Sequence, residues 1–146
     1  MDFDAVLAGA DRLGPIAYLA TVTPTGGPHV VPVHIDWHEG AAWVAVGPND
    51  VKVRNISANP EVCIHYEVGE ATAWDHLMVW GEAEVVADVA TKKAMWNIFS
   101  YDLDEFDSAG PASPDTVLLQ IQPRRALFLA RYGMDGSDEW RRGPAT

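Results

Sequence analysis

The chain has 146 residues, of which 48% are hydrophobic and 21% are charged, and its formal net charge at pH 7 is −11. These proportions are typical of one globular domain and exclude a disordered chain. The acidic balance argues against a nucleic-acid partner, because binding to a phosphate backbone needs clustered Lys and Arg. No apolar run approaches the ~20 residues that span a bilayer, and the N-terminus lacks the basic start of a secretory signal. Cys63 is the single cysteine, so no intrachain disulfide can form, and a cytoplasmic protein without a membrane partner is expected.

The first third of the chain predicts a short helix followed by three strands. Asp2 can cap a helix over 2–12, which Gly14-Pro15 ends. β-Branched and aromatic runs follow at 16–23, 28–37 and 41–47, separated by Gly-containing turns. Because short turns join neighbouring antiparallel strands, an antiparallel meander is expected here.

The pattern then changes to a short helix near 50–57, which Asn49-Asp50 can cap and Asn59-Pro60 ends. A fourth strand over 61–68 alternates, with Val62, Ile64, Tyr66 and Val68 on its apolar face. The remaining expected elements are a strand over 77–88 broken at Gly81, a helix over 89–99, a loop over 101–115, and strands over 116–121 and 126–132.

This order of elements predicts a mainly β fold with added helices. Six or seven antiparallel strands, with one short helix inserted after strand three, favour a closed barrel over a doubly wound sheet. One domain is expected over 1–132. The polar tail 133–146 has only Trp140 as an apolar anchor and is expected to be loosely held.

The segment Val46-Gly47-Pro48-Asn49-Asp50-Val51-Lys52 carries the candidate chemistry. A strand ends there, a Gly turn follows, and a helix begins, so free backbone N–H groups form an anion site. Lys52 adds a positive charge, and a phosphate is the expected guest. Arg54 points away from Lys52 on an ideal helix. On the residues alone, a solvated surface pair of Lys52 and Arg54 fits equally well.

Four ordered stretches resemble the FMN-binding split barrels related to pyridoxamine 5′-phosphate oxidase. They are Leu19-Ala20-Thr21-Val22 leading to Gly27-Pro28-His29-Val30-Val31-Pro32-Val33, Lys52-Val53-Arg54-Asn55-Ile56, Asn59-Pro60-Glu61-Val62, and Trp80-Gly81-Glu82-Ala83. Ala94-Met95-Trp96 and Val117-Leu118-Leu119-Gln120-Ile121-Gln122-Pro123 are similar to the general stress protein branch. The resemblance implies a split-barrel homodimer with FMN at its interface, acting on a small-molecule substrate.

The resemblance also implies which residues hold the cofactor. Lys52 would bind the phosphate, and the strand Val30 to Val33 and the turn Val46-Gly47 would lie along the flavin ring, mostly through backbone contacts. His34 would face the flavin edge, where an interface hydrogen bond is favoured over an acid–base role. The chemistry would be hydride or electron transfer at flavin N5, with no catalytic protein residue assigned. The expected cofactor-binding residues are Val30, Val31, Pro32, Val33, His34, Val46, Gly47, Lys52 and Arg54.

Three departures from the family pattern leave alternatives open. Asp50 and Val51 stand where the family often has Ser and Arg, and Val31 and Asp36 stand where the oxidase has basic phosphate contacts. The oxidase's substrate-binding Arg–His pair has no match near Trp140-Arg141-Arg142. The chain is therefore expected not to be a working pyridoxamine 5′-phosphate oxidase. Because Lys52-Val53-Arg54-Asn55 also resembles a sister branch that binds the deazaflavin F420, an F420-dependent reductase is one alternative, and a non-catalytic flavin- or haem-binding protein is another.

The remaining polar residues favour structural roles. The histidines lack zinc-binding spacing, so no metal site is expected. Cys63 and His65 share a strand face, but residues i and i+2 are ~6.5–7 Å apart, which is too far for a nucleophile pair. The acidic cluster over 102–107 lacks the pattern of a calcium loop and is expected to be solvated.

Overall fold

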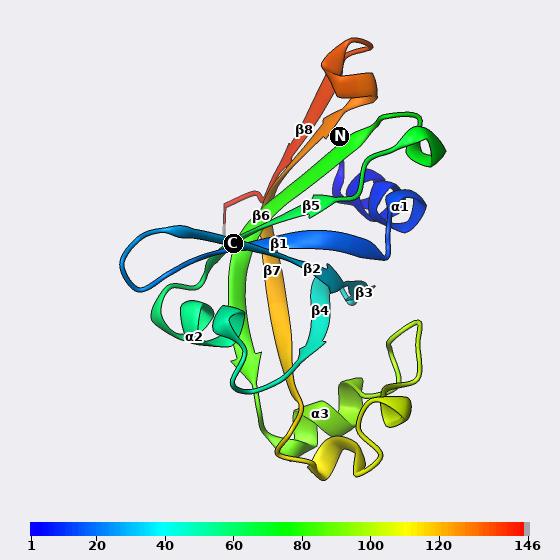
Figure 1. The fold of residues 1–146 in the computed structure, drawn as a ribbon. Helices are drawn as coiled ribbons and strands as arrows, with labels where there is room; N and C mark the ends of the chain where they lie inside the picture. The colour runs from blue at the N-terminus through cyan, green and yellow to red at the C-terminus, as the bar shows by residue number, and fades with distance from the viewer. Residues whose placement is uncertain (145–146) are drawn as a thin grey trace.

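One antiparallel sheet of eight strands, curled on itself, is the centre of the fold in the computed structural model, which describes residues 1–144 (Figure 1). The strands are β1 (Ile16–Val22), β2 (Pro28–His34), β3 (Asp36–His38), β4 (Ala41–Val46), β5 (Glu61–Tyr66), β6 (His76–Val86), β7 (Val117–Leu129) and β8 (Ser137–Arg141). The helices are α1 (Phe3–Leu13), α2 (Val51–Ala58) and α3 (Val89–Met95), with short 3-10 turns at Glu70–Thr72, Leu103–Glu105, Gly110–Ala112 and Ala130–Gly133. The predicted mainly β split barrel with added helices is confirmed.

The sheet closes through one bent segment of the chain. Its strand order is β2-β1-β5-β6-β7-β4-β3, with β8 added to β7. Ile35 alone separates β2 from β3, the two ends of that order, and its N–H donates to the carbonyl of Pro15 over 2.9 Å. The prediction of a single strand over 28–37 is therefore wrong. The segment exchanges its partner β1 for β4 at Ile35, and this change of partner curls the sheet.

The predicted strands over 116–121 and 126–132 are one continuous strand, β7, so that prediction is also wrong. Gly81 pairs with Pro123, and Trp80 pairs with Arg125, which leaves Arg124 as the extra residue of a β-bulge. The bulge accommodates a proline that cannot donate to the ladder, and the chain continues past it.

Side chains inside the barrel form the main core. On β5 the alternation is as predicted, with Val62, Ile64 and Tyr66 buried. The Tyr66 hydroxyl accepts a 2.7 Å hydrogen bond from Trp37 Nε1, which satisfies both polar atoms. A second, smaller cluster holds α3 and the segment after it against β4 and β7. It contains Ala41, Trp43, Val86, Trp96, Phe99, Leu103 and Leu118.

The ends of the chain are joined through β8, a strand that the sequence pattern does not predict. β8 pairs with the second half of β7. Trp140 packs on Phe3 with ring centroids 4.8 Å apart, and the N-terminal amine contacts Asp138 over 2.8 Å. The polar residues of this segment are mostly exposed and carry little apolar periodicity, so their pairing leaves no sequence signal. Within residues 1–144, no helix is long and apolar enough to cross a membrane.

Candidate functional site

A cleft of about 630 Å³ lies between β2, β4, the start of α2 and the segment that follows α3. This volume is within the range of small-molecule and cofactor sites. The lining residues are Pro32, Val33, His34, Val44, Ala45, Val46, Gly47, Asp50, Lys52, Tyr101, Leu103, Glu105, Phe106, Asp115 and Thr116. One wall thus comes from the sheet, and the other comes from a segment that the sequence predicts to be a loop.

The predicted cofactor residues are only partly brought together. Those that line the cleft are Pro32, Val33, His34, Val46, Gly47 and Lys52. Val30 lies on the outside of the sheet and is 57% exposed, and Val31 packs against the main core. Arg54 is exposed on α2 and is not part of the lining. The helical spacing thus predicts correctly that Arg54 and Lys52 point to different surroundings.

The predicted anion position at the start of α2 holds a carboxylate of the chain itself. Asp50 Oδ2 accepts a hydrogen bond from Lys52 Nζ over 2.9 Å and from the Gly47 N–H over 3.1 Å. The Lys52 ammonium holds the pKa of the Asp50 carboxyl below its ordinary value. The Lys52 side chain is only 16% exposed, so this ion pair is part of the cleft wall.

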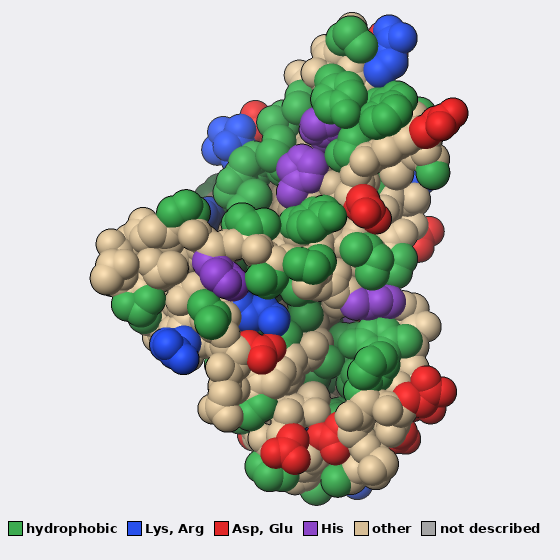
Figure 2. All heavy atoms as spheres, viewed as in Figure 1, with side chains coloured by type: hydrophobic (Ala, Val, Ile, Leu, Met, Phe, Trp, Pro, Cys, Tyr) green, Lys and Arg blue, Asp and Glu red, His purple; other side chains and the backbone are tan. Residues whose placement is uncertain are grey.

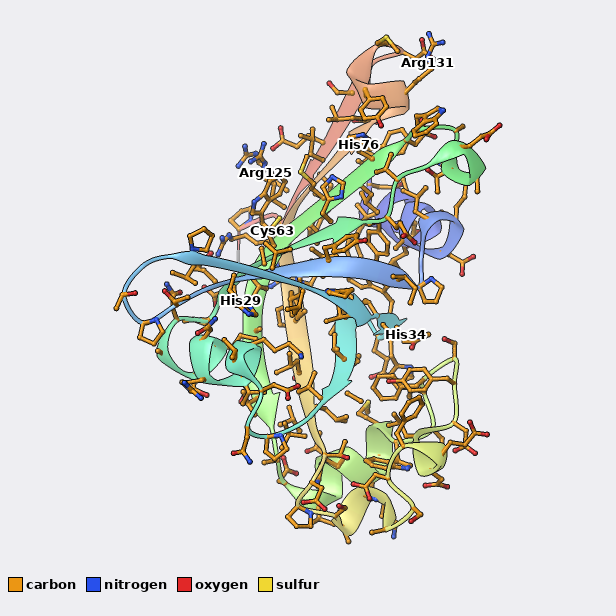
Figure 3. All side chains as sticks on the ribbon, in the orientation of Figure 1. His29, His34, Cys63, His76, Arg125 and Arg131 are labelled. Carbon is orange, nitrogen blue, oxygen red and sulfur yellow. The ribbon has the colours of Figure 1, made fainter. Side chains whose placement is uncertain are left out.

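His34 fastens the far wall to the sheet (Figure 3). Its Nε2 lies 2.8 Å from Ser100 Oγ and 3.1 Å from Asp36 Oδ2, and its ring meets Tyr101 edge-on at 4.3 Å. Burial raises the pKa of the Tyr101 hydroxyl. A Ser–His–Asp triad needs the aspartate on the opposite ring nitrogen from the serine. Here both meet Nε2, so the cluster positions Tyr101 and does not form a hydrolase triad.

A buried lysine, Lys92, holds the part of the cleft wall around residues 113–116. The Lys92 ammonium donates to the carbonyls of Ser113 and Thr116 over 2.7 and 2.9 Å. These bonds fix Asp115 and Thr116 at the edge of the cleft. A lysine on a short helix gives no sequence signal of burial, and for this reason the residue is absent from the sequence-based site.

The profile of the pyridoxamine 5′-phosphate oxidase family matches residues 12–130. The chain belongs to this family. No curated protein matches the chain. Solved structures of the family's fold cover nearly all of it. A protein related to general stress protein 26 of B. subtilis, from Clostridium acetobutylicum, has a TM-score of 0.77 at 16% identity, covering 97% of this chain and 96% of that one.

Two further structures carry cofactor names. An F420 reductase is 26% identical, with a TM-score of 0.60, over 80% of this chain and 94% of that chain. A pyridoxamine 5′-phosphate oxidase-related, FMN binding protein from Nostoc punctiforme is 14% identical, with a TM-score of 0.65, over 97% of this chain and 96% of that one. The general stress protein relative and the FMN binding protein are only 16% and 14% identical to this chain, so their similarity establishes the fold and nothing more.

The single cysteine of this family member does not form a nucleophile pair. Burial raises the pKa of the Cys63 thiol to about 11, so it is protonated at neutral pH and unreactive. His65, on the same strand face, donates from Nδ1 to the Tyr66 carbonyl over 2.7 Å. Cys63 and His65 therefore have structural roles.

The outside of the sheet beyond the cleft carries mostly apolar side chains, with His65 and Arg125 among them. Cross-strand pairing aligns Pro32, Tyr18, His65, Met78 and Leu127 in one row over five strands, and side chains opposite one another in a ladder share a face. The neighbouring row on the same face is Val30, Ala20, Cys63, Trp80 and Arg125. We call these two rows together the outer sheet face. Figure 2 shows hydrophobic and histidine side chains gathered over β1, β5 and β6. Because Pro32 also lines the cleft, the outer sheet face and the cleft adjoin.

Proposed function

We propose that the chain is an FMN-dependent oxidoreductase that acts on a small-molecule substrate as a cytoplasmic homodimer. The observation that carries the proposal is the 630 Å³ cleft, which combines apolar walls with a lysine at a helix start. Flavin, when bound, supplies hydride or electron transfer. The residues of the chain bind and orient the ring and exclude water from it.

The apolar part of the cleft fits a flat ring system. Val33, Val44 and Val46 come from the sheet, and Leu103 and Phe106 come from the opposite wall. Phe106 is 77% exposed, which leaves an apolar side chain at the rim for a ring or a substrate to cover. Lys52 is the cation that would meet the cofactor phosphate.

An F420-dependent reductase is the second candidate, because the F420 reductase reaches 26% identity. F420 carries a longer acidic tail, which needs more positive charge than FMN does. Among the described residues that line the cleft, Lys52 is the one cation, and Asp50, Glu105 and Asp115 are the three carboxylates. Arg54 is exposed outside that lining, and this arrangement favours FMN.

The deciding experiment is an absorption spectrum of the purified protein, followed by titration with FMN and with F420. We expect a flavin band or saturable FMN uptake. Uptake of F420 alone would make the protein an F420-dependent reductase. A haem Soret band would instead indicate a haem-binding protein. Protein that binds FMN but transfers no electrons from NAD(P)H to any acceptor would be a carrier or a sensor. Binding of none of the three would contradict the proposal.

Lys52→Ala is expected to weaken FMN affinity by about 1.5–3 kcal/mol, the range for a hydrogen bond to a charged group. The change removes the cation of the cleft and leaves the Asp50 carboxylate unpaired beside the phosphate. Fluorescence titration measures the effect. Arg54→Ala is the matched control from the same helix, with an expected change in FMN affinity below threefold. Equal FMN binding by Lys52→Ala and the parent would show that the FMN phosphate does not lie beside Lys52 and Asp50.

The homodimer proposal rests on the outer sheet face. Tyr18 and Val30 there are 38% and 57% exposed, and a second copy packed on this face would cover them and the open side of the cleft together. We expect light scattering to give twice the chain mass. Tyr18→Glu would place a charge in the interface and weaken dimerisation at least tenfold. Val89→Glu, an equally nonconservative change at an exposed valine on α3, is expected to leave the dimer intact. A monomeric parent protein would contradict this part of the proposal.

A further inference from the structure

The Asp50 side chain does not stabilise its own helix in the usual way. It is the N-cap residue of α2, yet its carboxylate makes no capping hydrogen bond. The backbone carbonyl of Asp50 alone accepts the first helical bonds, from Val53 and Arg54 over 3.1 and 3.2 Å. The carboxylate turns instead to Gly47 and Lys52, and both donate to the same oxygen, Oδ2. It thus occupies the position where a backbone N–H and an ammonium converge.

A phosphate bound at this end of the cleft would use those two donors. Anions bind at such places because exposed N–H groups and a positive side chain converge on one point. The Asp50 carboxylate already accepts from both, and it remains charged at neutral pH because Lys52 lowers its pKa. Glu105 and Asp115 add further negative charge to the described lining. The apolar part of the cleft can still take a flavin ring. The anion position beside it is already occupied by the Asp50 carboxylate.

We infer that Asp50 is a specificity-determining residue, an internal competitor whose carboxylate cancels the contribution of a cofactor phosphate to binding. The inference rests on the proposed function and deepens it. The site selects the flavin ring and its polyol chain and is nearly indifferent to the terminal phosphate. Riboflavin and FMN then bind the parent protein with dissociation constants within threefold of each other.

Substitutions at the two partners shift this ratio in opposite directions. Asp50→Asn keeps the size of the side chain but removes its charge, so the positive charge of Lys52 is left uncompensated and can attract a phosphate. We expect FMN to bind that variant at least tenfold more tightly than riboflavin. Lys52→Ala leaves the carboxylate uncompensated, so riboflavin is expected to bind more tightly than FMN. Asp4→Asn is the matched control, because it removes one exposed carboxylate that does not line the cleft. We expect it to change the ratio by less than threefold.

The test compares FMN and riboflavin titrations of all four proteins by flavin fluorescence. A parent protein that already prefers FMN tenfold, or a ratio unmoved by Asp50→Asn, would overturn the inference. Inorganic phosphate provides a second readout that needs no flavin. At matched ionic strength, phosphate is expected to raise the melting temperature of Asp50→Asn more than that of the parent, and the Asp50→Asn/Lys52→Ala double variant is expected to lose this gain. If flavin binds none of the proteins, the proposed function fails, and the phosphate comparison still decides the role of Asp50. Equal phosphate shifts in the parent and Asp50→Asn would then overturn it.

Discussion

Lys92→Met is expected to lower the free energy of unfolding by about 2–6 kcal/mol, since it leaves one buried and one partly buried carbonyl oxygen without donors at about 1–3 kcal/mol each. Lys92 is 2% exposed, and its ammonium bonds the Ser113 and Thr116 carbonyls. Methionine fills a similar volume, so lost packing contributes little. The segment it releases carries Asp115 and Thr116 of the cleft wall. FMN affinity is therefore expected to fall along with stability.

Urea unfolding measures the first effect, and FMN titration at low temperature measures the second. Lys93→Met is the matched control, because Lys93 is the exposed neighbour on the same helix. Its expected change in unfolding free energy is within about 0.5 kcal/mol, as for other surface substitutions. Equal midpoints for Lys92→Met and Lys93→Met would show that the buried ammonium does not hold the wall.

Local patterns predict the elements whose burial is decided by their own sequence. The alternation of β5 identifies its core face, and Asp2 caps α1 by accepting from the Ala5 N–H over 2.9 Å. Which strands pair with each other depends on residues far apart in the sequence, and the predictions fail where this pairing sets the limits of a strand. Ile35 looks like any other residue of an alternating run, and only the switch from β1 to β4 makes it a corner. β8 forms because β7 is long enough to pair with it after β4 has ended.

The site divides in the same way. Its sheet side, with Pro32 and Val46, and the lysine at the start of α2 follow from strand and helix signals together with the family resemblance. The opposite wall comes from a segment rich in Asp, Ser, Gly and Pro, whose composition indicates a solvated loop. Leu103 is nevertheless buried there, and Trp96 Nε1 donates to Asp104 over 2.9 Å. Such contacts bring together residues with no periodic relation, so no sequence pattern reports them.

Gly81→Ala is expected to lower the free energy of unfolding by about 3 kcal/mol, the upper end of the range for overpacking. A Cβ at this position would collide with the carbonyl oxygen of Gln122 and lie 3.0 Å from its carbonyl carbon and 3.1 Å from Pro123 Cα. These are backbone atoms of β7 and cannot turn aside as a flexible side chain would. Urea unfolding of the variant measures the effect.

Gly69→Ala separates this collision from the general cost of replacing a glycine. No atom lies within 4 Å of a Cβ built at Gly69, whose φ of −172° is ordinary extended backbone, so its expected effect is within about 0.5 kcal/mol. If Gly81→Ala unfolds at the same urea concentration as Gly69→Ala, β6 and β7 do not approach as closely as described. If it unfolds earlier, the bulge at Arg124 and the absence of a side chain at Gly81 act together. The bulge lets Pro123 remain in β7, and the glycine lets β6 pass against it, so this pair of features is what keeps the two longest strands paired along their whole length.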